Sequence, residues 1–99
     1  MAFRGNTNIR SICIGVLDND ACALNYIMLM LKQLNNRNGM MLAPWTTTFP
    51  ARALQECQHG MQHTDILLLD MALNGITGPQ VAQSIHHISP TTALLGMTS

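Results

Sequence analysis

Residues 65–77, DILLLDMALNGIT, form the stretch that decides the fold. Ile66 to Leu69 make a short unbroken apolar run, which is typical of a strand buried on both faces of a sheet. The run ends at a carboxylate, Asp70, and the following Asn74 and Gly75 favour a turn. An acid at the carboxyl end of a central parallel strand lies where open α/β sheets form their binding crevice. Asp70 is therefore the first candidate functional residue.

The composition indicates one small globular domain with few surface charges. The chain has 99 residues, of which 47% are hydrophobic and 10% charged, and its formal net charge is zero. A chain of this length normally forms a single core. The lysine and arginine residues are scattered along the sequence, so no basic face is predicted that would attract nucleic acid or a membrane surface.

The cysteines and the apolar runs bear on the compartment. Cys13, Cys22 and Cys57 are odd in number and include no Cys-x-x-Cys pair, which argues against a disulfide framework and favours a reducing compartment. The first ten residues lack the long apolar region of a signal peptide, and no apolar run reaches the roughly 18 residues of a membrane span. We expect a cytoplasmic protein without a membrane segment.

Strand and helix patterns alternate along the chain. We expect a flexible arm over residues 1–10 and a domain over 11–99. The predicted strands are 11–17, 40–45, 66–70 and 92–97, and the predicted helices are 21–34, 50–58 and a third one that ends at Ile88. Asp20 and Thr48 are candidate N-caps, and Thr77 to Gln80 has the form of a capping box. Pro44 predicts that its strand lies at an edge of the sheet.

The first helix carries more apolar residues than one buried face needs. Leu24, Ile27, Met28, Leu31 and Leu34 have the spacing of one helical face. Apolar residues also project elsewhere, at Tyr26, Leu29 and Met30. Something besides the sheet should therefore cover this helix.

The order of elements predicts an α/β fold. Strands that alternate with helices over short connections favour a doubly wound parallel sheet with helices on both faces. The carboxyl ends of parallel strands meet at one edge. We expect Asp18, Asp70 and Thr98 to lie close together at this edge, because each of them follows an apolar strand.

Three segments in this order, VLDND, LLLDMALNGITG and LLGMTS, resemble the receiver domain of bacterial two-component response regulators. The resemblance covers the chain from about Ile12 to Ser99. It implies a flavodoxin-like sheet with strand order 2-1-3-4, truncated after the fourth strand. It also implies a signalling domain rather than an enzyme, the regulatory part of a transcriptional response regulator whose partner is a sensor histidine kinase. A DNA-binding output domain would belong to a longer chain.

The resemblance also implies a role for each residue at the sheet edge. Asp70 would accept a phosphoryl group from a kinase histidine, and Thr98 would be the switch hydroxyl. Mg²⁺ would be bound by Asp18, Asp70 and the backbone carbonyl of Ala72, with Asn19 or Asp20 as a further candidate ligand. For Asp20 we favour capping over metal contact. Phosphoryl transfer to a carboxylate requires such a cation whatever the family, because the carboxylate and the anionic phosphoryl group repel each other.

The sequence departs from the receiver pattern in two places. Receivers usually have a pair of acids after the first strand, and Asn19 stands at the second position. The family lysine of a fifth strand is also missing, and Lys32 is predicted on the first helix, where it cannot substitute. We expect either a fragment of a longer regulator or a chain that completes itself by forming a homodimer, because an open strand edge and an apolar patch favour association.

Three alternatives remain at this stage. A degenerate receiver would serve only as an interaction or dimerisation module. An Asp18-x-Asp20 motif also resembles haloacid-dehalogenase-type phosphatases, with Asp18 as the nucleophile and Asp20 as the general acid. Cys57, His59 and His63 could form a metal site, although Gly60 interrupts the helix between the histidines and no fourth ligand is apparent.

Overall fold

The computed structural model describes residues 10–35, 40–73 and 78–98. The strands and helices alternate along the chain as β1 (Arg10–Leu17), α1 (Ala21–Leu34), β2 (Met40–Thr47), α2 (Pro50–His59), β3 (Ile66–Asp70), α3 (Gly78–Ile88) and β4 (Ala93–Met97). The predicted alternation of strands and helices is confirmed. The predicted flexibility of residues 1–9, the turn at Asn74 and Gly75, and the cap at Thr77 lie outside the described residues.

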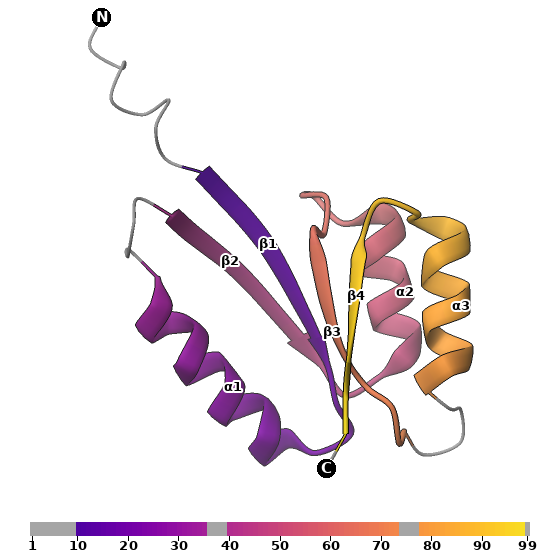
Figure 1. Ribbon diagram of the computed structural model, residues 1–99, viewed down its shortest axis with the longest axis horizontal. Coiled ribbons are helices and arrows are strands. Elements are labelled where there is room, and N and C mark those ends of the chain that lie inside the picture. Colours follow the sequence, from indigo (N-terminus) through magenta and orange to yellow (C-terminus); the bar gives the residue numbers. More distant parts are fainter. Residues whose placement is uncertain (1–9, 36–39, 74–77, 99) are drawn as a thin grey trace, which may run out of the picture.

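The strands form one parallel sheet with the order β2-β1-β3-β4, as predicted. β1 pairs with β2 on one side and with β3 on the other, and β4 extends the sheet beyond β3. Figure 1 shows α1 on one face of the sheet and α2 with α3 on the other. Within the described ranges, no helix is both long and apolar enough to cross a membrane.

The two faces of β3 are buried to different extents. Leu67 and Leu69 are fully buried in a core that also contains Val81 and Ile85 of α3. Ile66 and Leu68 point to the opposite face, where they pack against the core beneath α1 but are only partly buried. The predicted strand is confirmed, but the predicted burial on both faces is not, because only the face that packs against α2 and α3 is fully buried.

The start of α1 follows the sequence prediction. Asp20 is the N-cap, and its Oδ1 accepts a hydrogen bond of 2.9 Å from the backbone N–H of Cys22. Leu24 and Leu31 are buried against the sheet, whereas Tyr26 and Leu29 are exposed. The prediction of a helix that is apolar on more than one side is confirmed.

The predicted end of the second strand was wrong. β2 continues past Trp45 to Thr47, because Thr46 and Thr47 pair with the last residues of β1. Thr48 is therefore not the cap of α2. The N-cap is Phe49, which makes no side-chain cap, while Thr47 Oγ1 accepts a hydrogen bond of 3.1 Å from the N–H of Phe49.

Other boundaries differ by one residue. Arg10, which we assigned to the arm, is the first residue of β1, and β4 begins at Ala93 instead of Thr92. α2 extends to His59 and has Gly60 as its C-cap. Pro44 is accommodated within β2 because that strand lies at the edge of the sheet, where only one side needs backbone hydrogen bonds.

A buried polar cluster fixes the start of β3. Thr64 Oγ1 accepts a hydrogen bond of 3.1 Å from Trp45 Nε1 and lies 3.8 Å from the Cys13 thiol. Thr92 Oγ1 donates to the Thr64 carbonyl oxygen over 2.8 Å. Asp65 Oδ2 accepts from the N–H of Cys13 over 2.9 Å. These contacts join β1, β2, β3 and the start of β4 at the end of the sheet opposite Asp70.

Candidate functional site

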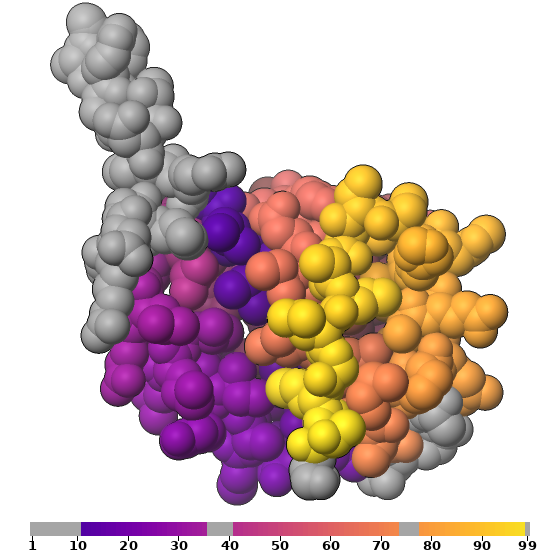
Figure 2. All heavy atoms as spheres, viewed as in Figure 1, coloured from indigo at the N-terminus to yellow at the C-terminus, as the bar shows by residue number. Residues whose placement is uncertain are grey.

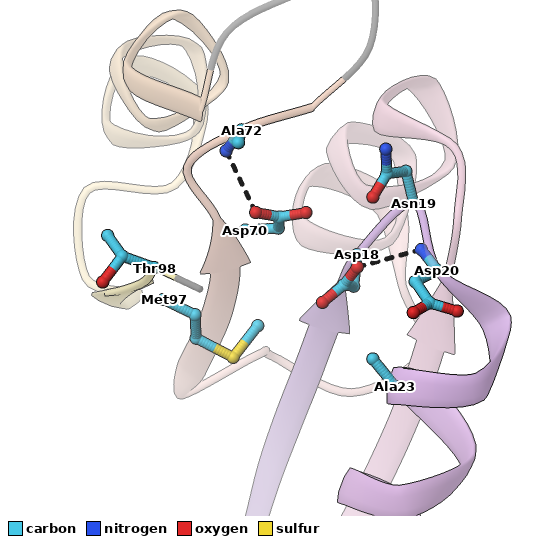
Figure 3. Close-up of a pocket in the computed structure, with 8 residues that line it drawn as sticks. All are labelled: Asp18, Asn19, Asp20, Ala23, Asp70, Ala72, Met97 and Thr98. Atoms are coloured by element: carbon cyan, nitrogen blue, oxygen red, sulfur yellow. Dashed lines mark hydrogen bonds between the residues drawn. The ribbon is translucent and has the colours of Figure 1, made fainter.

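A pocket lies where the carboxyl ends of β1, β3 and β4 meet. It has a volume of about 380 Å³. Its lining includes most of the residues that the sequence singled out: Asp18, Asn19, Asp20, Asp70, Ala72 and Thr98, together with Ala23 and Met97. Figure 3 shows that these residues come from three separated parts of the chain. The site thus depends on the parallel arrangement of the strands.

Asp70 ends β3, and the backbone that follows orients its carboxylate. The N–H of Ala72 donates to Asp70 Oδ1 over 3.0 Å. In Figure 3 the other carboxylate oxygen is turned toward the side of the pocket that Asp18 and Asn19 line. One oxygen is therefore held by the chain, and the other one faces the pocket.

The backbone beyond Asp70 is attached to β4. The N–H of Met71 donates to the Met97 carbonyl oxygen over 3.0 Å, which continues the pairing of the two strands. Thr98 directly follows this pairing and is exposed. The end of β4 consequently brings a hydroxyl residue to the same pocket as the Asp70 carboxylate.

Asp18 follows β1 and is the acid whose proton affinity the site alters. Its Oδ1 accepts a hydrogen bond of 2.9 Å from the N–H of Asp20, and its own N–H donates to the Thr47 carbonyl oxygen over 3.2 Å. Partial burial raises the pKa of the Asp18 carboxyl above its usual value. The negative charges of Asp70 and Asp20 contribute to this increase, while the hydrogen bond from Asp20 opposes it.

The other two candidate ligands differ in what they can offer. The Asp20 carboxylate caps α1, as described above, so one of its oxygens is committed to the backbone. Asn19 is exposed and also lines the pocket, where its amide is drawn near the acids in Figure 3. Ala72 lines the pocket as well, but the role of its carbonyl oxygen as a metal ligand stays a prediction.

The donor set fits a hard cation that keeps water ligands. Among the described residues, no group of three or more His, Cys, Asp or Glu side chains forms a metal site. The pocket does bring Asp18 and Asp70 together, and the negative charge of Asp70 adds to the effect of burial in raising the pKa of Asp18. Mg²⁺ binds through one or two carboxylates plus waters and backbone oxygens, so these residues suit it.

The alternative metal residues do not share a site. Cys57 is buried in the core, and burial raises the pKa of its thiol. His59 is exposed near the end of α2. His63 Nε2 makes a hydrogen bond of 3.1 Å with the Thr91 hydroxyl.

Sequence reasoning missed two pocket residues, Ala23 and Met97. Met97 immediately precedes Thr98, and Ala23 lies in the first turn after the acids, so both could have been found from their distance to the predicted site residues. Their side chains are apolar. They bound the pocket on the side of the core beneath α1.

No protein-family model matches this sequence, and no curated protein does. Solved structures with the same fold are found. A response regulator receiver domain from Clostridium thermocellum superimposes with a TM-score of 0.72 and 21% identity, covering 88% of this chain and 64% of that one. An adenylate cyclase from Rhodopirellula baltica gives a TM-score of 0.74 at 22% identity, covering 87% of this chain and 58% of that one.

A third similar chain belongs to a complex of a histidine kinase with a response regulator protein. Its TM-score is 0.67 at 19% identity, with 89% of this chain and 69% of that chain covered. This chain therefore has the flavodoxin-like fold of receiver domains, and it spans less than two thirds of the receiver domain and cyclase chains. At these identities the likeness establishes the fold alone, and the function has to be argued from the pocket.

Proposed function

We propose that this chain is a receiver of two-component signalling that accepts a phosphoryl group on Asp70 from a histidine of a sensor kinase. One observation carries the proposal: Asp70 and Asp18 follow adjacent central strands and line one open pocket together with Thr98. The receiver fold of the similar structures supports it. The domain would act as a stoichiometric acceptor in its own phosphorylation, without turning over a separate substrate.

The contacts of Asp70 suggest which atom reacts. The Ala72 N–H holds Oδ1, so Oδ2 is the oxygen available to attack phosphorus. The new bond joins Oδ2 to phosphorus, the phosphorus–nitrogen bond of the phosphohistidine breaks, and the nitrogen keeps that electron pair. Because chemistry of this kind depends mainly on position and charge, the fixed carboxylate is an important part of the site.

Asp18, Asp70 and the Ala72 carbonyl would hold Mg²⁺, with Asn19 as a further oxygen ligand. When bound, the cation neutralises charge on the acids and on the incoming phosphoryl group. Asp18 would bind the cation as a carboxylate, and the cation would offset the negative charge of Asp70 beside it. Asp20 would support the site indirectly by capping α1, because its Oδ1 accepts a hydrogen bond from the N–H of Cys22.

Thr98 would bind the phosphoryl group after transfer. Thr98 lines the pocket at the end of β4, on the side opposite the first helix. A hydroxyl that donates to a phosphoryl oxygen forms a charge-assisted bond. This bond would shift the end of β4, which is paired with β3 up to Asp70. Phosphorylation would therefore change the position of a strand at the edge of the sheet.

The biological setting follows from the same proposal. The kinase is the expected partner, the protein would be cytoplasmic, and the domain would regulate transcription as part of a response regulator. The alternative of a degenerate interaction module is motivated by Asn19, which replaces an acid in the pocket. The phosphatase alternative assigns Asp18 as the nucleophile, but it leaves Asp70 without a role.

Intact-mass measurement after incubation with Mg²⁺ and acetyl phosphate tests the proposal. We expect a single added phosphoryl group in the unaltered chain and none in Asp70→Asn, an isosteric change that keeps the acceptor for the Ala72 N–H. Asp65→Asn serves as the control, because that acid lies at the opposite end of the sheet. Phosphorylation that is lost in Asp18→Asn but retained in Asp70→Asn would instead favour the phosphatase chemistry. No phosphorylation of any variant would favour the degenerate module.

A further inference from the structure

We propose that a second copy of this chain docks on an apolar surface that the fold leaves open beside α1. We call it the α1–β4 surface and define it by Tyr26, Leu29 and Met30 on α1 together with Ile66, Leu68 and Leu95 on β3 and β4. Two copies related by a two-fold axis would each place the outward side of α1 on the other's β3 and β4. Both helices would then share one layer between the two sheets.

The first observation is that α1 is apolar on opposite sides. Leu24 and Leu31 are buried on the side that faces the sheet. On the other side Tyr26 is 66% exposed and Leu29 is 59% exposed. A helix that is apolar around most of its circumference is normally buried between two layers. The sheet supplies one of these layers.

The second observation is that the sheet is incompletely covered on the α1 face. Leu67 and Leu69 are fully buried beneath the other two helices, whereas Ile66 and Leu68 of the same strand are only partly buried. Leu95 lies next to Leu68 in the sheet register and is 54% exposed. Figure 2 shows atoms of β1 and β3 at the surface between α1 and β4.

The position of α1 explains the opening. Asn25 lines a hollow with Thr46 and Thr47 at the end of β2, while Ala23 on the other flank lines the pocket that includes Met97. α1 therefore covers the β2 and β1 side of the sheet and leaves β3 and β4 beside it. Two adjacent strands span about 10 Å, which matches the diameter of one helix. The open half is wide enough for one further helix.

The helix that could cover β3 and β4 of one copy is α1 of a second copy. In the described ranges, α1 is the helix with large exposed apolar side chains, and α2 and α3 have none. An arrangement in which each α1 covers the partner's strands buries both halves of the surface at once and closes after two copies. Charge does not oppose it, because Lys32 is the one charged residue of α1 and β4 has none.

This inference does not depend on phosphorylation of Asp70. None of the residues that define the α1–β4 surface is among the residues that line the pocket of Asp18 and Asp70. Failure of the dimer test would leave the phosphorylation test unchanged, and the reverse also holds.

Sedimentation velocity of the unaltered chain at micromolar concentrations tests the proposal. We expect a dimer. Leu29→Lys on the helix side and Leu95→Glu on the strand side should each raise the dissociation constant by at least about tenfold, because each variant places a charge in both copies of the contact. Met61→Lys is the matched control, since Met61 is fully exposed and lies outside the surface.

Mixing the two variants gives the specific result. A mixed pair contains one unaltered contact and one contact that joins lysine to glutamate, so equal amounts of Leu29→Lys and Leu95→Glu should recover the dimer. Circular dichroism shows whether each variant is folded, and Tyr26→Lys replaces Leu29→Lys if the latter is not. A monomeric unaltered chain, dimers that persist in both single variants, or a mixture that stays monomeric would each overturn the proposal. A monomer would leave the surface to another protein or another segment.

Discussion

Replacing Gly15 with alanine tests how β1 is held beneath the functional pocket. Gly15 lies opposite Trp45 in the register of β1 and β2. A Cβ atom at Gly15 would lie 2.2 Å from Cζ2 of Trp45 and within 2.6 Å of two more indole atoms. Carbon atoms pack at about 3.5–4.0 Å, so the ring would have to move by more than 1 Å. The indole therefore lies directly on the backbone of the strand that leads to Asp18.

The size of the effect follows from what the movement would break. Overpacking of a core commonly costs about 1–3 kcal/mol. Displacing the indole would also strain its hydrogen bond of 3.1 Å to Thr64 Oγ1, a loss of about 1 kcal/mol. We expect Gly15→Ala to lower the free energy of unfolding by about 2–4 kcal/mol, which in a domain of this size lowers the Tm by roughly 10–30 °C.

A double-mutant cycle measured by urea unfolding checks this reasoning. In a Trp45→Leu background the shorter side chain leaves room for a methyl group, so Gly15→Ala should cost less than about 1 kcal/mol there. Gly96→Ala is the matched strand control, since the three atoms nearest to its Cβ would all belong to the flexible side chain of Met71, the nearest at 3.0 Å. Equal costs of Gly15→Ala in the two backgrounds would refute the packing argument.

Three further predictions concern the pocket. Because the pKa of Asp18 is raised in the folded chain, its contribution to stability is present at low pH and is lost as pH rises from about 3.9 through the folded value. Above that range and without divalent cations, Asp18→Asn should increase the free energy of unfolding by up to about 1 kcal/mol. In thermal scans, added Mg²⁺ should raise the Tm of the unaltered chain but not the Tm of this variant. Asp20→Ala should lower the free energy of unfolding by about 1 kcal/mol, because the helix loses its cap. Mg²⁺ should still raise the Tm of this variant. If it does not, Asp20 is a metal ligand. Gly78→Ala should reduce phosphorylation by acetyl phosphate, because its Cβ would lie 2.4 Å from Cα of Met71 in the loop after β3, whereas Gly96→Ala should not.

The strand and helix alternation could be predicted because each element shows its own local pattern. Apolar runs, two of which end at acids, gave the strands, and the Asp20 cap was confirmed by its bond to Cys22. The gathering of Asp18, Asp70 and Thr98 required one further step, which is that parallel strands share a carboxyl edge. The strand order came from the resemblance to receiver domains, because local patterns do not specify which strands are neighbours.

The errors arose where pairing between distant strands outweighed local preference. Thr48 has the side chain of an N-cap, but the two preceding threonines pair with β1 and extend the strand, which leaves Phe49 as the cap. The contact of Trp45 with Gly15 could not be predicted either. A tryptophan and a glycine 30 positions apart carry no local signal that one covers the other.

By itself, the sequence determined the type of each element, the acids that follow the strands and the excess of apolar residues on α1, because these depend on neighbours along the chain. Only the tertiary structure decided that Asp18 is partly buried beside Asp70, which raises its pKa, and that one oxygen of Asp70 is held by Ala72. It also decided which half of the sheet α1 covers and which half it leaves open. These properties depend on distances between residues that are far apart in the chain, and those distances exist only after the strands have paired.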